Sequence, residues 1–230
     1  LAKGDVSQTY VDIFQEDIDV FQQEILDIVE KYGEYKFGSR NLTGFGLVVL
    51  SGGEKIDGAN GADFRRDTWL WHGNSTQAHS HLDTLQLGID AYGHNFTPDL
   101  GYPAATSNDP NRGQWVKNTL SHNTVVVNGN AQKGRTNGDP LHYDGDGIVK
   151  LIDVEDPDVY DETDIYRRTL VSVDASDEVS YTVDFFRILG GNEHMYSFHT
   201  QSANGYTTDD LTLVPQKNEK GQYIGSYAGA

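Results

Sequence analysis

Hydrophobic positions near the start of the chain recur at steps of three and four residues, with acidic and amide side chains between them. The positions with this spacing are Tyr10, Phe14, Ile18, Phe21, Ile25 and Val29. This periodicity is typical of one face of a helix, so we predict a helix over residues 7–32, capped by Gly33. Because its apolar face needs a partner, we expect the helix to pack on a following sheet or on further helices.

From residue 44 onward the pattern changes to short apolar or alternating runs separated by Gly, Asn and Asp turns. The runs that we predict as strands are residues 45–50, 68–72, 85–92, 94–97, 125–127, 148–154, 169–173, 179–188 and 195–199. Two polar stretches, residues 106–113 and 134–146, are predicted as loops. This spacing indicates a mainly β protein, a large antiparallel β-sandwich preceded by a helix.

Composition and charge narrow the class of protein. The chain has 230 residues, 25 of them Gly and 13 Tyr, which suits one large domain or one domain with part of another. It contains no Cys, so any metal must be held by His, carboxylate or amide groups. The net charge of −18 argues against nucleic acid, and no apolar run has the length of a membrane span. We expect a secreted or periplasmic bacterial protein, processed or cut from a longer chain.

Four polar residues stand out as candidates for chemistry. His79 and His81 are two residues apart, Asp99 precedes a Gly-Tyr-Pro turn, and His122 opens a β-branched run. Side chains at i and i+2 of a strand share one face, and adjacent antiparallel strands can bring their ends together. Two His and one Asp supply three ligands and leave a position for water, a set that suits Zn²⁺, with Mn²⁺ or another divalent ion as alternatives.

Other polar and aromatic residues would support such a site. The candidates for holding the far ring nitrogens of the histidines are Asp83, Ser121 and Asn123. Each of the three tryptophans, Trp69, Trp71 and Trp115, suits either the core or stacking on sugar rings, and the place of Trp115 after a polar loop favours ligand contact.

Two stretches resemble the heparinase II/III-type domain of bacterial polysaccharide lyases. They are residues 79–103, HSHLDTLQLGIDAYGHNFTPDLGYP, and residues 115–132, which follow the pattern W..NTLSHNTVVVNG.AQ. The match is clear over residues 45–132. The resemblance implies an (α/α) toroid followed by a large antiparallel β-sandwich. Residues 1–40 would then be the end of the toroid or a linker helix, and residues 41–230 a sandwich that is incomplete at its C-terminus.

The resemblance also implies roles for individual residues. His81, Asp99 and His122 would be the metal ligands, and His79 would face the substrate. In the family the catalytic Tyr, a further His and an Asn come from the toroid, of which this chain holds at most the last helix. Within the chain, Tyr102 and Tyr143 are the local alternatives for proton transfer, and Tyr102 is kept as the candidate catalytic residue.

The function implied is a metal-containing lyase that cleaves a uronic-acid polysaccharide by β-elimination. Its partner would be an anionic polysaccharide or oligosaccharide, and a homodimer is compatible with this function. Two alternatives stay open: a non-catalytic carbohydrate-binding sandwich that keeps the metal site, and a uronate C5-epimerase. Because the chain is acidic, we expect a local positive cleft to receive the anionic substrate. The residues expected to form it are Arg65, Arg66, Lys117, Lys133 and Arg135.

Overall fold

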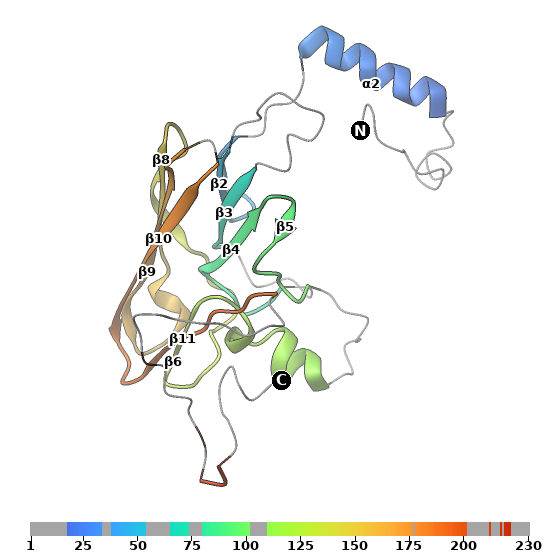
Figure 1. Ribbon diagram of the computed structural model, residues 1–230. Helices are drawn as coiled ribbons and strands as arrows, with labels where there is room; N and C mark the ends of the chain where they lie inside the picture. The colour runs from blue at the N-terminus through green and yellow to red at the C-terminus, as the bar shows by residue number, and fades with distance from the viewer. Residues whose placement is uncertain are drawn as a thin grey trace.

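The computed structural model describes residues 18–33, 38–53, 65–73, 80–101, 110–176, 178–201, 212, 217 and 219–221. The helix α2 (Ile18–Tyr32) ends at Gly33, whose positive φ of 81° closes the last turn with a bond from its N–H to the Val29 carbonyl. The predicted helical residues before Ile18 lie outside the described residues. Figure 1 shows α2 apart from the sheets. Among the described helices, none is long and apolar enough to cross a membrane.

One layer of the structure is an antiparallel five-stranded sheet in the order β1-β2-β3-β4-β5. Its strands are β1 (Arg40–Leu42), β2 (Leu47–Gly52), β3 (Arg66–Trp71), β4 (Gln86–Ala91) and β5 (His94–Asn95). The sequence predicts β2 to β5 with ends shifted by a few residues. It does not predict β1, which has no apolar run of its own and is held by its pairing with β2.

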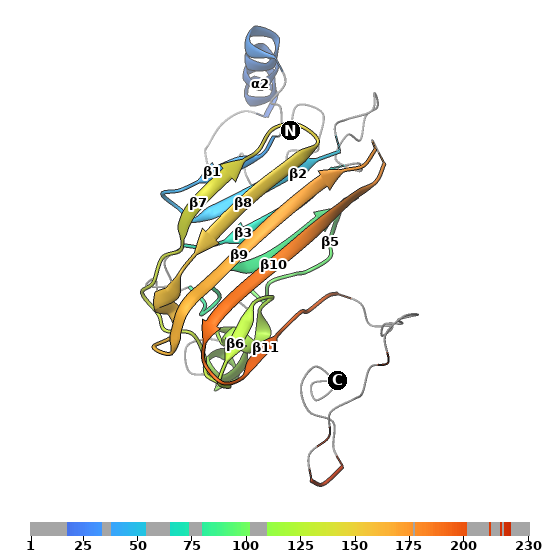
Figure 2. The same cartoon turned by 90° about the vertical axis from the view of Figure 1, so that its left-hand side faces the viewer.

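The opposite layer is a four-stranded antiparallel sheet in the order β10-β9-β8-β7 (Figure 2). Its strands are β7 (Asp139–Asp144), β8 (Val149–Glu155), β9 (Thr163–Asp174) and β10 (Ser180–Gly190), and a two-stranded sheet pairs β6 (Val125–Val127) with β11 (His194–Tyr196). The prediction of a loop over residues 134–146 is wrong for residues 139–144, which form β7. Since β7 is an edge strand with mainly exposed side chains, it shows no apolar alternation.

The core lies between the two layers and is built from alternate positions of their strands. Val48, Leu50 and Leu70 come from the first sheet, and they form one buried cluster with Ile152 and Leu170 of the second. The three valines of β6 are buried on both sides, which explains why that short strand follows from sequence alone. The architecture is therefore the predicted antiparallel sandwich.

A close contact fixes one aromatic ring on the outer face of the first sheet. Trp69 of β3 is paired with Gly88 of β4, and a Cβ built on Gly88 would lie 1.8 Å from the Trp69 ring. The indole N–H of Trp69 donates to the Asp90 carboxylate at 2.8 Å. The indole therefore lies across the glycine with its polar edge anchored.

Gly88→Ala should displace this ring and lower the free energy of unfolding by about 1–3 kcal/mol, because an added methyl in packed surroundings forces neighbours to move. Urea denaturation followed by tryptophan fluorescence measures the change. Gly113→Ala is the matched control, since a Cβ at Gly113 meets nothing within 4 Å. Equal effects of the two substitutions would show that Trp69 is not tightly held on Gly88.

Candidate metal centre

Three of the predicted site residues meet at one end of the sandwich. His81 lies in the segment that precedes β4, Asp99 follows β5, and His122 follows the 3-10 helix Thr119–Ser121. His81 Nδ1 lies 2.9 Å from His122 Nε2 and 3.4 Å from Asp99 Oδ1, and His122 Nε2 lies 3.2 Å from Asp99 Oδ2. β6 starts at Val125, so His122 lies before this strand and not in it. The helical turn, rather than a strand, aims this ring.

The orientation of His122 is set by the turn before it. Its Nδ1 lies 2.7 Å from the Asn118 carbonyl oxygen and 3.2 Å from Ser121 Oγ. A carbonyl oxygen can only accept, so Nδ1 carries the hydrogen and the Nε2 lone pair is left facing His81 and Asp99. This is the arrangement by which a ligating histidine is usually held. Asn123, by contrast, bonds the Leu87 carbonyl and so does not serve a ring nitrogen.

Asp99 is held as a carboxylate by a tight turn. Its Oδ1 accepts the Gly101 N–H at 2.6 Å, and its Oδ2 accepts the Gln86 amide at 3.2 Å. Gly101 has a φ of 60°, which explains the glycine two residues after Asp99. Burial opposes ionisation of Asp99, but its contacts with His122 and His81 and the Gly101 N–H outweigh burial and hold its pKa well below the usual range. The side chain is therefore an anion across the physiological range.

Asp83 is the fourth member of the cluster. One ligand atom from each of His81, Asp83, Asp99 and His122 lies within 4.8 Å of the others. Burial raises the pKa of Asp83, against the attraction of His122. Burial also opposes the charge on His122, but Asp99 and Asp83 outweigh it and raise the pKa of His122. The carboxylates that favour a proton on this ring would equally favour a cation beside it.

The donor set fits a small divalent ion. Ligands at Zn–N and Zn–O distances of about 2.0–2.1 Å form a tetrahedron with edges of roughly 3.3 Å. The distances of 2.9, 3.2 and 3.4 Å among the His81, His122 and Asp99 donors are close to such edges. Imidazole and carboxylate are ligands that Zn²⁺ and Mn²⁺ both accept, so the donor set would suit either ion.

A groove of about 1000 Å³ opens beside the cluster. One part of its lining is aromatic: Trp69, Trp71 and Phe45 line it, and Phe45 meets Trp71 edge-on with ring centroids 5.1 Å apart. At another part, His81 and Asp99 reach the groove from the cluster. The sequence pattern predicts Phe45 as the first residue of a strand, so it does not reveal that this ring lines the groove. In the structure Phe45 is exposed in the turn before β2.

The described lining of the groove carries negative charge. Asp83, Asp99 and Asp139 line it, and within the described chain no Lys or Arg does so. The expected positive cleft is therefore wrong for the described part of the chain. Arg65 pairs with Asp67 at 2.6 Å, and Lys133 pairs with Asp161 at 2.6 Å, away from the groove.

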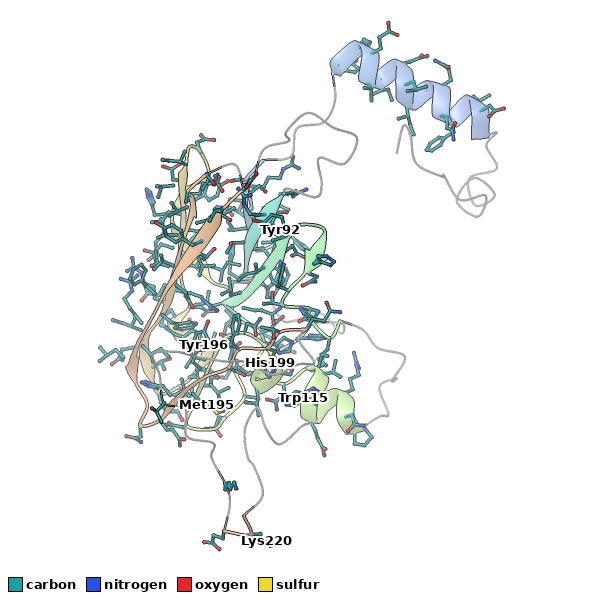
Figure 3. All side chains as sticks on the ribbon, viewed as in Figure 1. Tyr92, Trp115, Met195, Tyr196, His199 and Lys220 are labelled. Atoms are coloured by element: carbon teal, nitrogen blue, oxygen red, sulfur yellow. The ribbon has the colours of Figure 1, made fainter. Side chains whose placement is uncertain are left out.

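The remaining predicted residues divide into two groups. His79 and Tyr102 lie outside the described residues. Tyr143 stands in β7 and packs against the core, and it does not line the groove, so it is not a proton-transfer candidate there. Trp115 is also outside the groove lining and contacts His199 edge-on, with ring centroids 5.8 Å apart (Figure 3).

Arg168 supports the cluster from the opposite sheet, and sequence reasoning missed it. Its side chain is 0% exposed. It forms a two-point ion pair with Asp184 at 2.9 and 2.7 Å, and it also bonds the hydroxyl of Tyr196 at 2.8 Å. Its Nη1 donates to the carbonyls of Leu85 and Asn123, both at 2.6 Å. These two carbonyls belong to the segments that carry His81 and His122, so one guanidinium ties both segments to β9.

Comparison with known proteins identifies relatives of this arrangement. A sequence profile described as "Heparinase II/III-like, C-terminal" matches residues 58–211, well over half of the chain. Heparan sulfate lyase HepC from Pedobacter heparinus is 16% identical with a TM-score of 0.54, and the match covers 79% of this chain and 26% of that one. A structure titled Heparinase III is 23% identical with a TM-score of 0.52, with coverage of 69% and 24%. The chain thus spans about a quarter of the length of these structures, which show its fold. No curated protein sequence matches the chain.

Proposed function

Because the chain belongs to the heparinase II/III-like, C-terminal family, we propose that it is the β-sandwich part of a lyase that cleaves a uronic-acid polysaccharide by β-elimination. The observation that carries the proposal is the aromatic-lined groove, which reaches the cluster of His81, Asp99 and His122 through His81 and the half-buried Asp99. Flat aromatic faces suit sugar rings, and the cluster suits a divalent ion. Together they suit an acidic sugar chain next to a metal centre.

β-Elimination asks two things of the protein. The proton on C5 of the uronate leaves, a double bond forms between C4 and C5, and the oxygen on C4 departs and takes up a proton. The C5 proton is removable only when the charge of the adjacent carboxylate is neutralised. We assign this task to His79, two residues before His81, and the proton transfers to a Tyr, for which Tyr102 is the candidate in this chain. His81, Asp99 and His122 would hold a divalent ion, which would supply positive charge two residues from His79.

The charge of the groove favours a polymer without sulfate groups. Its described lining holds no Lys or Arg, and residues 67–111 contain none in their sequence, while Asp139 lines the groove outside the metal cluster and is not offset by a bound ion. Each sulfate about 8 Å from an uncompensated carboxylate would cost roughly 2 kcal/mol at an effective dielectric constant of about 20. A polymer whose carboxylates are its sole anions needs neutralisation at fewer points, so we propose an unsulfated or sparsely sulfated uronate polymer.

The test uses the intact protein, loaded with metal, and a panel of uronate polymers. Formation of the unsaturated uronate is followed by its ultraviolet absorbance. The panel includes heparin and heparin that has been fully desulfated and N-acetylated, because these share a backbone and differ in sulfate. We expect product from at least one polymer, and kcat/KM at least about tenfold higher on the desulfated backbone than on heparin, equivalent to ~1.4 kcal/mol.

Each outcome decides a separate point. No unsaturated product from any uronate polymer would overturn the lyase proposal. In that case, incorporation of solvent deuterium at C5 without cleavage would indicate an epimerase. Binding of a polymer with neither cleavage nor deuterium incorporation would indicate a carbohydrate-binding sandwich. Faster cleavage of heparin than of its desulfated form would retain the lyase but overturn the proposed preference for low sulfation.

A further inference from the structure

The Asp83 carboxylate is buried at the cluster without a hydrogen bond to one of its oxygens. The residue is 8% exposed, and its Oδ1 has no hydrogen-bond partner within the part of the chain that the structure describes. An ionised carboxylate taken out of water costs several kcal/mol unless an opposite charge accompanies it. Its neighbours in the cluster are the donor atoms of His81, Asp99 and His122, all facing the same small space.

The backbone on both sides of Asp83 is fixed, so the point from which its side chain leaves the backbone is set. The Leu82 N–H donates to the Lys117 carbonyl at 3.0 Å, and the Asp83 carbonyl accepts the Gln86 N–H at 2.9 Å. The side-chain amide of Gln132 bonds both the N–H and the carbonyl of Thr84, at 2.8 and 2.9 Å. A segment held at this many points presents its side chain in a set position.

Three donors do not fill a tetrahedral site. The His81, His122 and Asp99 donor atoms form one face, with edges of 2.9 to 3.4 Å. A structural zinc site takes its fourth ligand from the protein, whereas a catalytic site leaves the fourth position for water or substrate. Asp83 is the fourth group that the described chain places in reach of the same point.

We propose that Asp83 is the fourth protein ligand of this centre, which closes the ion off from solvent and substrate. Two neutral imidazoles and two carboxylates carry a charge of −2, which cancels a divalent ion and leaves a neutral buried unit. The ion is then a structural element that joins three segments, and the substrate carboxylate is neutralised by other groups. This inference rests on the proposed metal site but does not depend on the lyase reaction.

Cobalt substitution tests the closed site on the unaltered protein. Co²⁺ takes the place of Zn²⁺ and reports its coordination through visible absorption bands. Azide is then added, since it binds an open cobalt position and shifts those bands. We expect no change in the spectrum of the wild-type protein at any azide concentration that leaves it folded. A saturable azide shift in the wild-type protein would overturn the proposal.

Substitution of Asp83 provides a second, independent measurement. Asp83→Asn keeps the shape of the side chain and Asp83→Ala removes it, and metal affinity is measured by competition with a chromogenic chelator. Loss of a group that merely supports a ligand weakens metal binding about 10–100-fold, so a ligand should cost more than ~100-fold. The Co²⁺ form of Asp83→Ala, prepared with excess metal, should respond to azide. Asp139→Asn is the control, because Asp139 lines the groove outside the cluster and should leave metal affinity unchanged.

The remaining outcomes are also decisive. A loss of less than ~100-fold for Asp83→Asn, the range of a group that only supports a ligand, would overturn the proposal. If a variant fails to fold, the azide titration of the wild-type protein alone still decides between an open and a closed site. Both measurements are made without substrate, so failure of the lyase assay leaves them unaffected.

Discussion

Arg168→Met should lower the free energy of unfolding by about 3–5 kcal/mol, which is the range for breaking a buried ion pair by removing one partner. The guanidinium bonds Asp184, Tyr196 and the carbonyls of Leu85 and Asn123, and methionine replaces none of these bonds. Since single domains are stable by about 5–15 kcal/mol, this loss is a large fraction of the total stability. Arg168→Lys should recover only part of the loss, because an ammonium group cannot reproduce the two-point pair and both carbonyl bonds.

The neighbouring residue provides the matched control. Arg167 lies on the opposite face of β9 and pairs with Asp153, and its side chain is 30% exposed. Asp153 keeps Thr169 and Arg187 as partners when Arg167 is removed, so Arg167→Met should cost about 1 kcal/mol or less. Urea denaturation of the three variants measures the loss in the free energy of unfolding for each. Similar losses for Arg167→Met and Arg168→Met would contradict a special role for the buried guanidinium.

His122→Ala should abolish tight metal binding. The wild-type protein should carry one divalent ion per chain after dialysis, and the variant should carry none. An ion present at 100 times its dissociation constant stabilises the folded state by about 2.7 kcal/mol. A chelator should therefore lower the melting temperature of the wild-type protein and leave that of His122→Ala unchanged.

Another histidine serves as the reference for this experiment. His142 is exposed in β7 and belongs to no group of ligands within the described chain, so His142→Ala should retain both the ion and the response to chelator. Elemental analysis and calorimetry measure the two effects. If His122→Ala keeps the ion with unchanged affinity, the assignment of His122 as a ligand is wrong.

The fold follows from sequence where burial imposes a pattern. The three valines of β6 and the alternation in β3 and β10 are visible in the sequence, because one or both faces of these strands are covered. β7 and β1 escape prediction because they are edge strands, held by backbone pairing with β8 and β2 instead of by side-chain burial. Their positions depend on partners elsewhere in the chain, which local patterns do not contain.

The sequence predicts which residue types form the site, but it does not predict that they meet or which residues hold them in place. His81, Asp99 and His122 stand out as candidates, yet local patterns do not show that the three meet, since 41 residues separate the two histidines. The sequence does carry a signal for Arg168. This residue falls between Tyr166 and Leu170 in the buried alternation of β9, where an apolar residue is expected. A charged residue at a buried position of a strand indicates a buried ion pair.

The bonds from Arg168 also bear on the order in which the molecule folds. They span 83 residues to Leu85 and 45 residues to Asn123, and contacts between distant segments form slowly because long loops must close first. His81, Asp99 and His122 precede Arg168 in the chain and are synthesised before it. The bonds from Arg168 that fix the backbone of the centre can therefore form only after β9 has been synthesised.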